Sequence, residues 1–288
     1  MLVIVGFLVV IGSVLGGFMW AGGHVGALIH PSEILVIGGA AAGAMVVMAS
    51  KKKLIDLVKG CIQAVKGSPF TRKSYDELFQ LQYELFRLAR KEGLLALEPH
   101  LADPHESEIF NRYPTISKNH HATDFLVGAL APVVDGTIKP DRLPELLETE
   151  IRAIEEEHHG PLGVLNKTAD ALPGFGIVAA VLGIVITMGH IDGPVEEIGH
   201  KVGAALVGTF LGILASYGFL APMATKLEFL GQEEMVFFRT IAVVVMGYVT
   251  ELPPRIAIEQ GRRGLPSHLK CSREQLEEMF KAIDTAGR

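Results

Sequence analysis

The sequence predicts an all-α membrane protein with four transmembrane helices, a large helical cytoplasmic insert and a cytoplasmic C-terminal tail. Its 288 residues have a mean hydropathy of +0.35, and only 20% of them are charged. Soluble domains usually carry about 25% charged residues, so a membrane protein is favoured. The apolar residues form two blocks, near the N-terminus and around residues 172–225, and the charged residues lie mostly between and after them.

Four stretches are long enough to cross a bilayer, which takes about 20 apolar residues as a helix. They cover residues 2–20, 34–50, 172–189 and 202–225, and none contains Asp, Glu, Lys or Arg. The first stretch has an alternative interpretation as a signal peptide. It lacks a basic n-region and is longer than a typical h-region, so a membrane span is favoured.

The basic residues near the span ends predict the orientation. The loop between spans one and two has no Lys or Arg, and the loop between spans three and four has only Lys201. The opposite ends carry Lys51, Lys52, Lys53, Lys59, Lys66, Lys167 and Lys226. We therefore expect a multi-pass protein of the bacterial inner membrane with both termini in the cytoplasm. Its predicted regions are 1–50 (spans one and two), 51–171 (insert), 172–225 (spans three and four) and 226–288 (tail).

The insert and the tail are predicted to be helical. Ser74 and Glu77 fit a capping box at a helix start, and Gly93 fits its end. An apolar stripe at helical spacing follows, made of Leu78, Leu81, Leu85 and Leu88. A second helix is expected to begin near Pro140, and a third to cover residues 272–283 in the tail.

Small residues recur at four-residue spacing in the spans. The longest row is in span four and consists of Ala204, Gly208, Gly212 and Ser216. Small residues let helix backbones approach closely in lipid. The row predicts either packing within one bundle or a contact stripe against another chain.

The sequence contains no motif of an enzyme or of a nucleotide-binding site, so neither catalysis nor a cofactor is expected. A net charge of −6 argues against binding to nucleic acid. Two adjacent histidine pairs, at 120–121 and 158–159, are poor metal ligands because neighbours on a helix do not share a face. No predicted span has an interior carboxylate, so a proton-binding group would have to come from a partner.

Two prolines are expected at the cytoplasmic edge of the membrane. Pro173 falls in the predicted first turn of span three, where proline is tolerated, and Pro222 falls near the end of span four. Pro222 cannot donate to the carbonyl of Gly218, so it should kink or end that helix. The pair is interpreted either as simple helix punctuation or as a hinge that passes motion from the membrane to the cytoplasm.

Several long stretches resemble the MotA family of flagellar motor proteins. They are LPGFGIVAAVLGIV around Pro173, GTFLGILASYGFLAPMATKL at 208–227, HESEIFNRYP at 105–114, and the opening GFLVVIGSVLGGFMWAGGHVGAL. The similarity covers nearly the whole chain. It implies a stator subunit that surrounds the membrane helices of a MotB-like partner, as a pentamer around a partner dimer. The partner would supply a membrane aspartate and a peptidoglycan-binding domain, and ion flow would drive the subunit against the rotor switch protein FliG.

The resemblance also assigns roles to residues. Pro173 and Pro222 match the family's two functional prolines, which raises the hinge interpretation above helix punctuation. Arg90 and Glu98 match the charged pair that meets the rotor, and Glu150 matches a further acidic position of less weight.

The same resemblance bears on the coupling ion. Thr209 matches a hydroxyl that faces the ion path. Sodium-driven relatives have a threonine seven residues after the proline of span three, where this chain has Ala180. Losing that oxygen favours protons over sodium, although Thr187 and Thr209 remain as ligands.

Two alternatives stay open. An energiser of the ExbB/TolQ type would drive a periplasm-spanning partner instead of a rotor, but such relatives typically have three spans. Two apolar stretches before Lys51 favour the MotA family. A self-sufficient transporter is disfavoured by the charge-free spans, which leave a purely structural scaffold possible.

Overall fold

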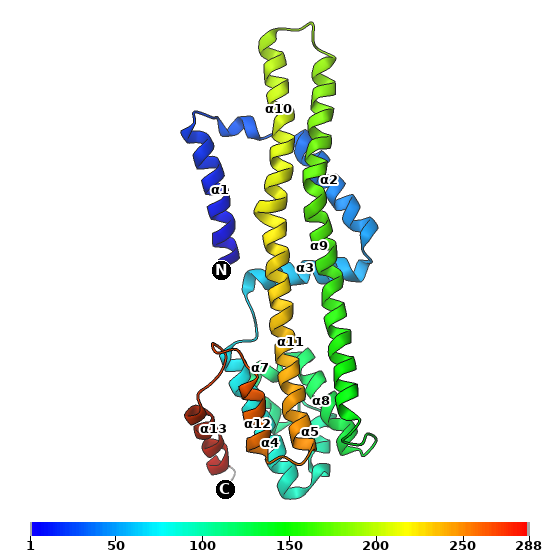
Figure 1. Ribbon diagram of the computed structural model, residues 1–288, viewed down its shortest axis with the longest axis vertical. Helices are drawn as coiled ribbons and strands as arrows, with labels where there is room; N and C mark the ends of the chain where they lie inside the picture. Colours follow the sequence, from blue (N-terminus) through cyan, green and yellow to red (C-terminus); the bar gives the residue numbers. More distant parts are fainter. Residues whose placement is uncertain (1, 287–288) are drawn as a thin grey trace. The chain divides into compact units, whose positions relative to one another are not determined.

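The computed structural model describes residues 2–286, whose regular elements are all helices joined by loops, with no β-strand among these residues (Figure 1). The predicted all-α class is therefore confirmed. In chain order the elements are α1 (Leu2–Trp20), η1 (Val25–Leu28), α2 (Pro31–Met48), α3 (Lys51–Lys66), α4 (Arg72–Glu92), η2 (Leu94–Leu97), α5 (Glu98–Ala102), α6 (Glu108–Asn111), α7 (Pro114–Ser117), α8 (His120–Val134), α9 (Leu143–Met188), α10 (Val195–Ile213), η3 (Leu214–Leu220), α11 (Ala221–Val249), α12 (Pro254–Arg263) and α13 (Arg273–Ala286).

The chain forms two compact units, each built from two separate segments. Unit 1 comprises Met1–Gly67 and Glu156–Leu230, and unit 2 comprises Ser68–Glu155 and Gly231–Arg288. Both α9 and α11 contribute residues to each unit. These units are defined by contacts within the chain. The predicted regions 1–50, 51–171, 172–225 and 226–288 were defined by the expected membrane boundaries, so the two units do not test them.

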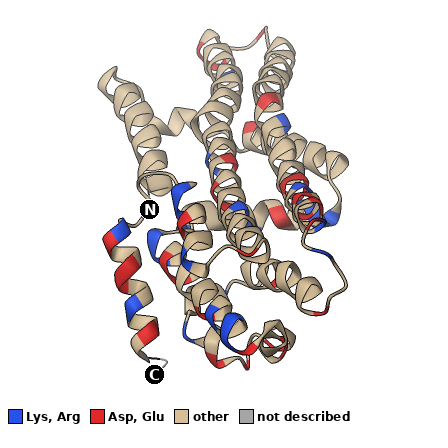
Figure 2. Ribbon diagram, turned by 60° about the horizontal axis from the view of Figure 1, so that its bottom comes forward, with Lys and Arg blue, Asp and Glu red and all other residues tan. Residues whose placement is uncertain are grey.

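Among the described residues, four helical segments are long and apolar enough to cross a membrane, as predicted. The first is α1, and Figure 2 shows its ribbon free of charged residues. The other three are longer than expected: Val25–Met48, Leu143–Met188 and Val195–Val249. The third and fourth apolar stretches are thus parts of helices that continue beyond them in the sequence.

The small residues of α10 pack against α9 within the same chain. A Cβ atom built on Gly208 would lie 3.0 Å from the Cβ of Ala179, and one on Gly212 would lie 2.7 Å from the carbonyl oxygen of Leu172. Gly183 makes a similar approach to Ala205. The row in span four therefore serves packing within one bundle, and this part of it is not a stripe facing another chain. The physical reason is that both helices carry small residues at matching heights, so their backbones come together.

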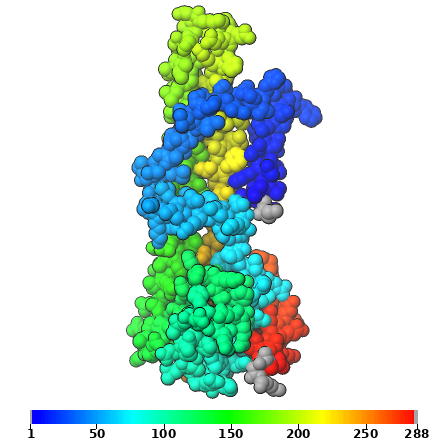
Figure 3. Space-filling model, turned by 180° about the vertical axis from the view of Figure 1, so that it is seen from behind, coloured from blue at the N-terminus to red at the C-terminus, as the bar shows by residue number. Residues whose placement is uncertain are grey.

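Helices α2 and α3 complete the described part of unit 1. Ile37 and Ala41 of α2 pack in one apolar cluster with Leu172 and Ala179 of α9. The chain then turns at Ser50, whose side chain caps α3 by accepting from the backbone N–H of Lys53. Figure 3 shows α2 and α3 in lighter blue on the face of unit 1 that is seen from behind.

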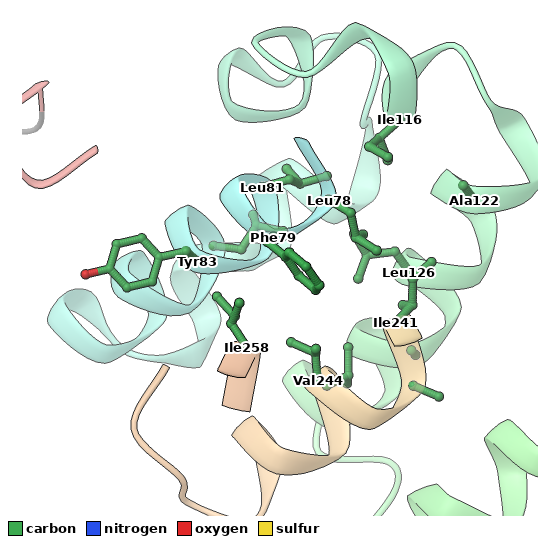
Figure 4. Close-up of a cluster of buried hydrophobic side chains, with 14 of the residues drawn as sticks. Leu78, Phe79, Leu81, Tyr83, Ile116, Ala122, Leu126, Ile241, Val244 and Ile258 are labelled. Carbon is green, nitrogen blue, oxygen red and sulfur yellow. The ribbon is translucent and has the colours of Figure 1, made fainter. Parts of the chain in front are cut away.

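Unit 2 has a single apolar core, drawn in Figure 4. The stripe predicted on α4 supplies Leu78, Leu81 and Leu85, which are fully buried, and Leu88, which is partly buried. Across from them lie residues of α7, α8, α11 and α12, among them Ile116, Leu126, Ile241, Val244 and Ile258. Helix α13, red in Figure 3, packs on α4 as well.

Two predicted details of α4 come out differently. The helix begins one turn earlier than expected, because Thr71 and Ser74 form the capping box and Ser74 is its third residue rather than its cap. Glu77 does not cap the helix and instead accepts hydrogen bonds from the backbone N–H (2.8 Å) and hydroxyl (2.6 Å) of Thr115. The end at Gly93 is confirmed, with a φ of 92° that favours glycine.

Candidate functional site

Pro173 lies in the interior of α9, far from the helix start. The helix runs unbroken for 46 residues from Leu143, so Pro173 is not in a first turn. The expectation of a first-turn proline was wrong because the polar sequence before residue 172 continues the same helix. An interior proline removes one backbone hydrogen bond and crowds the carbonyl four residues earlier. Pro173 therefore marks a weak point of the helix, and helix punctuation does not explain it.

Pro222 follows a π-helical stretch, η3, that joins α10 to α11. The helix neither ends there nor keeps its regular hydrogen bonds: the N–H of Ala221 donates to the carbonyl of Ser216, five residues earlier. A wider turn is a direct way to relieve the clash between the proline ring and the carbonyl of Gly218. Such π-turns occur often at functional sites.

Of the three residues assigned to the ion path, Ala180 and Thr209 lie at the contact between α9 and α10, and Thr187 lies further along α9. Ala180 is buried, and its backbone N lies 3.2 Å from a Cβ built on Gly208. Thr209 is half-buried, and its Cα lies 3.2 Å from a Cβ built on Gly176. Thr187 is fully buried two turns further along α9, and its hydroxyl donates to the carbonyl of Gly183 at 2.8 Å. Ala180 and Thr209 thus share one helix contact, whereas the Thr187 hydroxyl is bonded within its own helix.

Arg90 and Glu98 flank a sharp turn in unit 2. Arg90 lies in the last turn of α4, and Glu98 begins α5, with Gly93 and η2 between them. Both side chains are exposed. Leu95 of η2 is also exposed, at 69%. We call the segment from Arg90 to Glu98 the α4–α5 tip: it has an exposed charged residue at each end and an exposed leucine between them in the sequence.

The α4–α5 tip is held by polar contacts along α4. The buried carboxylate of Glu84 pairs with Arg112 and accepts from the hydroxyl of Tyr113 at 2.9 Å. One turn later, Arg87 donates to the carbonyl of Ile283 in α13 at 2.9 Å. The segment at 105–114 is thereby clamped onto the helix that carries Arg90.

Glu150 is placed apart from the α4–α5 tip. It lies on α9, half-buried, with its carboxylate oxygens 3.9–4.0 Å from a Cβ built on Gly128 of α8. Burial raises the pKa of the Glu150 carboxyl above its ordinary value. The structure thus gives Glu150 a packing environment that Arg90 and Glu98 do not have.

Sequence reasoning missed two residues. Glu33 was placed outside span two, but α2 begins at Pro31, so Glu33 lies in the first turn of that helix and is only 7% exposed. A proline at the first helical position is a known start signal that could have extended the span. Ser216 was considered only as a small residue, but its hydroxyl makes a buried hydrogen bond to another helix. No sequence signal pointed to that bond.

Four helical segments long and apolar enough to cross a membrane define a multi-pass membrane protein. Comparisons with known families agree. The family described as motility protein A, N-terminal, matches residues 4–93, and the MotA/TolQ/ExbB proton channel family matches residues 117–239.

The sequence is also similar to individual proteins over nearly its full length. It is 38% identical to motility protein A of Salmonella typhimurium over 283 residues, which cover 98% of this chain and 96% of that protein. It is 38% identical to the chemotaxis protein LafT of Vibrio parahaemolyticus over 95% of this chain and 96% of that one. The chain therefore belongs to the MotA family and is a stator subunit of the bacterial flagellar motor, a non-enzymatic protein.

Solved structures support the same fold. The fold resembles the MotAB structure of C. jejuni with a TM-score of 0.76, at 23% identity and with 92% of this chain and 95% of that chain covered. It resembles the flagellar MotAB stator complex of Bacillus subtilis with a TM-score of 0.74, at 24% identity and with 96% and 98% covered.

Proposed function

We propose that this stator subunit works with a MotB-like partner and moves protons only together with it. One observation carries the proposal: in a chain of a proton channel family, the four apolar stretches 2–20, 34–50, 172–189 and 202–225 contain no acid. A proton crossing a bilayer needs titratable groups within it. Glu33 lies at one end of α2, so it does not supply a group at mid-membrane. The partner's membrane aspartate would supply that group, and its peptidoglycan-binding domain would anchor the complex.

Protons are the proposed coupling ion. Sodium needs several oxygen ligands, as hard cations do. Ala180 offers no side-chain oxygen, so the hydroxyls of Thr187 and Thr209 are the side-chain oxygens of the three path residues. The Thr187 hydroxyl donates to the carbonyl of Gly183, which fixes it against its own helix. Two hydroxyls are fewer oxygen ligands than a sodium site needs, whereas a proton path through water needs none.

We place the four spans in the bacterial inner membrane, and both termini and the long insert in the cytoplasm. The lysines that follow α2 in the sequence support this orientation, since basic residues stay on the cytoplasmic side. In this orientation the α4–α5 tip faces the rotor.

The α4–α5 tip is the proposed contact with the rotor switch protein FliG. Arg90 and Glu98 are exposed and carry opposite charges, and Leu95 offers apolar area between them in the sequence. Interfaces commonly have such an apolar centre with a charged rim. Glu150 takes a smaller part in the proposal because it is half-buried against α8.

Pro173 and Pro222 are the proposed hinge that couples ion flow to movement of the insert. The interior position of Pro173 and the π-turn before Pro222 support this role, because both weaken the regular helix.

Five copies around a partner dimer is the assembly implied by the family resemblance. In the single chain, α1 has no buried residue, and many of its apolar side chains are exposed. These side chains can contact lipid or neighbouring subunits.

Co-expression with a MotB-like protein in cells that lack their own stators tests the proposal. Swimming should return with the wild-type partner and be absent when the partner's membrane aspartate is replaced by asparagine. Normal assembly without swimming in the first case would contradict the stator function in that pairing.

Proteoliposomes test the dependence on a partner. The purified chain alone should not carry protons into vesicles that hold a pH-sensitive dye. If it does, a Glu33→Gln variant tells whether Glu33 is the titrating group. Proton flux by the chain alone would refute the proposal that the partner supplies the proton-binding carboxylate, whichever residue of this chain is responsible.

A further inference from the structure

Pro173 leaves one carbonyl of α9 without its usual donor. In an α-helix the N–H of a residue donates to the carbonyl four residues earlier, so residue 173 would serve Ala169. Proline has no N–H to give. Ala169 is only 2% exposed, so water has little access to replace the missing donor. A buried carbonyl without a partner is costly, and native structures almost always provide one.

Ser216 provides that partner from another part of unit 1. Its hydroxyl donates to the carbonyl oxygen of Ala169 at 2.6 Å, and Ser216 itself is 1% exposed. Hydroxyls within helices commonly bond the carbonyl four residues earlier in their own helix. Thr168 and Thr187 of this chain do so. Ser216 instead crosses to α9 and bonds the one carbonyl that Pro173 has deprived of its donor.

The turn that carries Ser216 is the π-turn before Pro222. The carbonyl of Ser216 accepts from the N–H of Ala221, five residues later, so Ser216 is part of the widened turn itself. Each residue along an α-helix advances by about 100° around the axis. Returning η3 to regular α-helical bonding would therefore turn Ser216 relative to α11 and move its hydroxyl away from Ala169.

Close packing explains the size of this residue but not its hydroxyl. Ser216 continues the row of Gly208 and Gly212, both of which lie against the backbone of α9. Alanine or glycine would satisfy that contact equally well. The deprived carbonyl of Ala169 is the feature that requires a donor.

We propose that Ser216 is a positioning residue that couples the two prolines: its hydroxyl replaces the donor that Pro173 lacks, from a turn that Pro222 sets. The hydrogen bond holds α9 and η3 together in the present conformation, and bending at Pro173 has to break or lengthen it. Its part in rotation rests on the proposed hinge function, whereas the hydrogen bond between Ser216 and Ala169 does not.

A double-mutant cycle on the purified full-length stator complex tests the bond. Ser216→Ala should lower the melting temperature by about 2–4 °C, as expected for one hydrogen bond in a protein of this size. In a Pro173→Ala background, residue 173 regains its N–H and serves Ala169, so Ser216→Ala should then have less than half of that effect. Equal effects in the two backgrounds would overturn the proposal, because the hydroxyl would then serve something else.

Two further variants sharpen the cycle. Thr168→Val removes a neighbouring buried hydroxyl whose acceptor, the carbonyl of Val164, keeps its backbone donor. Its effect should be small and the same in both backgrounds. Ser216→Cys keeps a side chain of similar size with a weaker donor, so its melting temperature should fall between those of serine and alanine.

Rotation of tethered cells measures the functional part. One hydrogen bond within a membrane protein typically shifts an equilibrium by about threefold, so Ser216→Ala should change torque while membrane levels stay normal. Normal torque in Ser216→Ala would overturn the coupling to rotation even if the cycle shows the bond. Normal torque in Pro173→Ala would instead refute the hinge and leave the melting cycle intact, which separates the two failures.

Discussion

The closest approach between α9 and α10 gives the sharpest test of the packing. A Cβ atom built on Gly212 lies 2.7 Å from the carbonyl oxygen of Leu172 and 2.8 Å from the Cα of Gly176. These are backbone atoms, so they cannot rotate away. Ordinary van der Waals contact begins at 3.4 Å, so Gly212→Ala has to push the helices apart by about 0.7 Å.

A matched substitution isolates the cost of that movement. Gly199 lies in the same helix, and a Cβ built there meets nothing within 4 Å. Both changes to alanine gain the same helix propensity, about 1 kcal/mol, which cancels in the comparison. Overpacking typically costs about 1–3 kcal/mol. The movement also strains the hydrogen bond from Ser216, one turn away on the same face. We expect Gly212→Ala to be about 2 kcal/mol less stable than Gly199→Ala.

The assay is thermal melting of the purified stator complex, together with the amount of each variant in the membrane. Gly212→Ala should melt several degrees below Gly199→Ala, which should melt at or above the wild type. If Gly212→Ala melts with or above Gly199→Ala, then the close helix contact is not made as described. That result would also refute the packing of the small residues of span four against α9.

Three further predictions concern unit 2. Charge reversal of Arg90 and Glu98 together should reduce torque in tethered cells while the complex still assembles, because both side chains are exposed and carry no core packing. Leu95→Asp should have a similar effect, since Leu95 is 69% exposed; unchanged torque would remove Leu95 from the rotor contact. Burial raises the pKa of the Glu150 carboxyl in the folded protein. The neutral carboxyl is tolerated at and below its ordinary pKa of 4.5, and folding stability is lost as the pH rises through the raised value, because a buried charge then forms. Glu150→Gln should therefore raise the melting temperature at pH 7, and a gain that does not shrink toward pH 4.5 would refute this reasoning.

Helix content and the four apolar segments could be predicted because both follow from local composition. Residues 2–20 lack charge and match α1 in full. The limits of the other spans could not be found in the same way. Pro173 looked like a first-turn proline because apolarity begins at residue 172, yet α9 begins at Leu143. Hydropathy reports the lipid boundary, whereas helix length depends on backbone hydrogen bonds that continue past it.

The candidate residues divide along similar lines. The roles of Arg90, Glu98, Pro173 and Pro222 were inferred from the family resemblance and stay predictions. The burial of Glu150 against α8 was not visible, because it depends on a contact with Gly128 across the helix pair. The first turn of α2 likewise brought Glu33 into a helix whose apolar part alone had been recognised.

The sequence by itself determined the class of this protein: an all-helical membrane chain of the MotA family, without an acid in the middle of its spans. Apolar length, charge asymmetry and motif identity are properties of the chain that need no coordinates. Only the tertiary structure decided what the small residues and prolines contact. The row of Gly208 and Gly212 faces α9, and the hydroxyl of Ser216 reaches the carbonyl freed by Pro173. Those facts depend on which helices approach each other and at what rotation, and spacing along one chain does not fix either quantity.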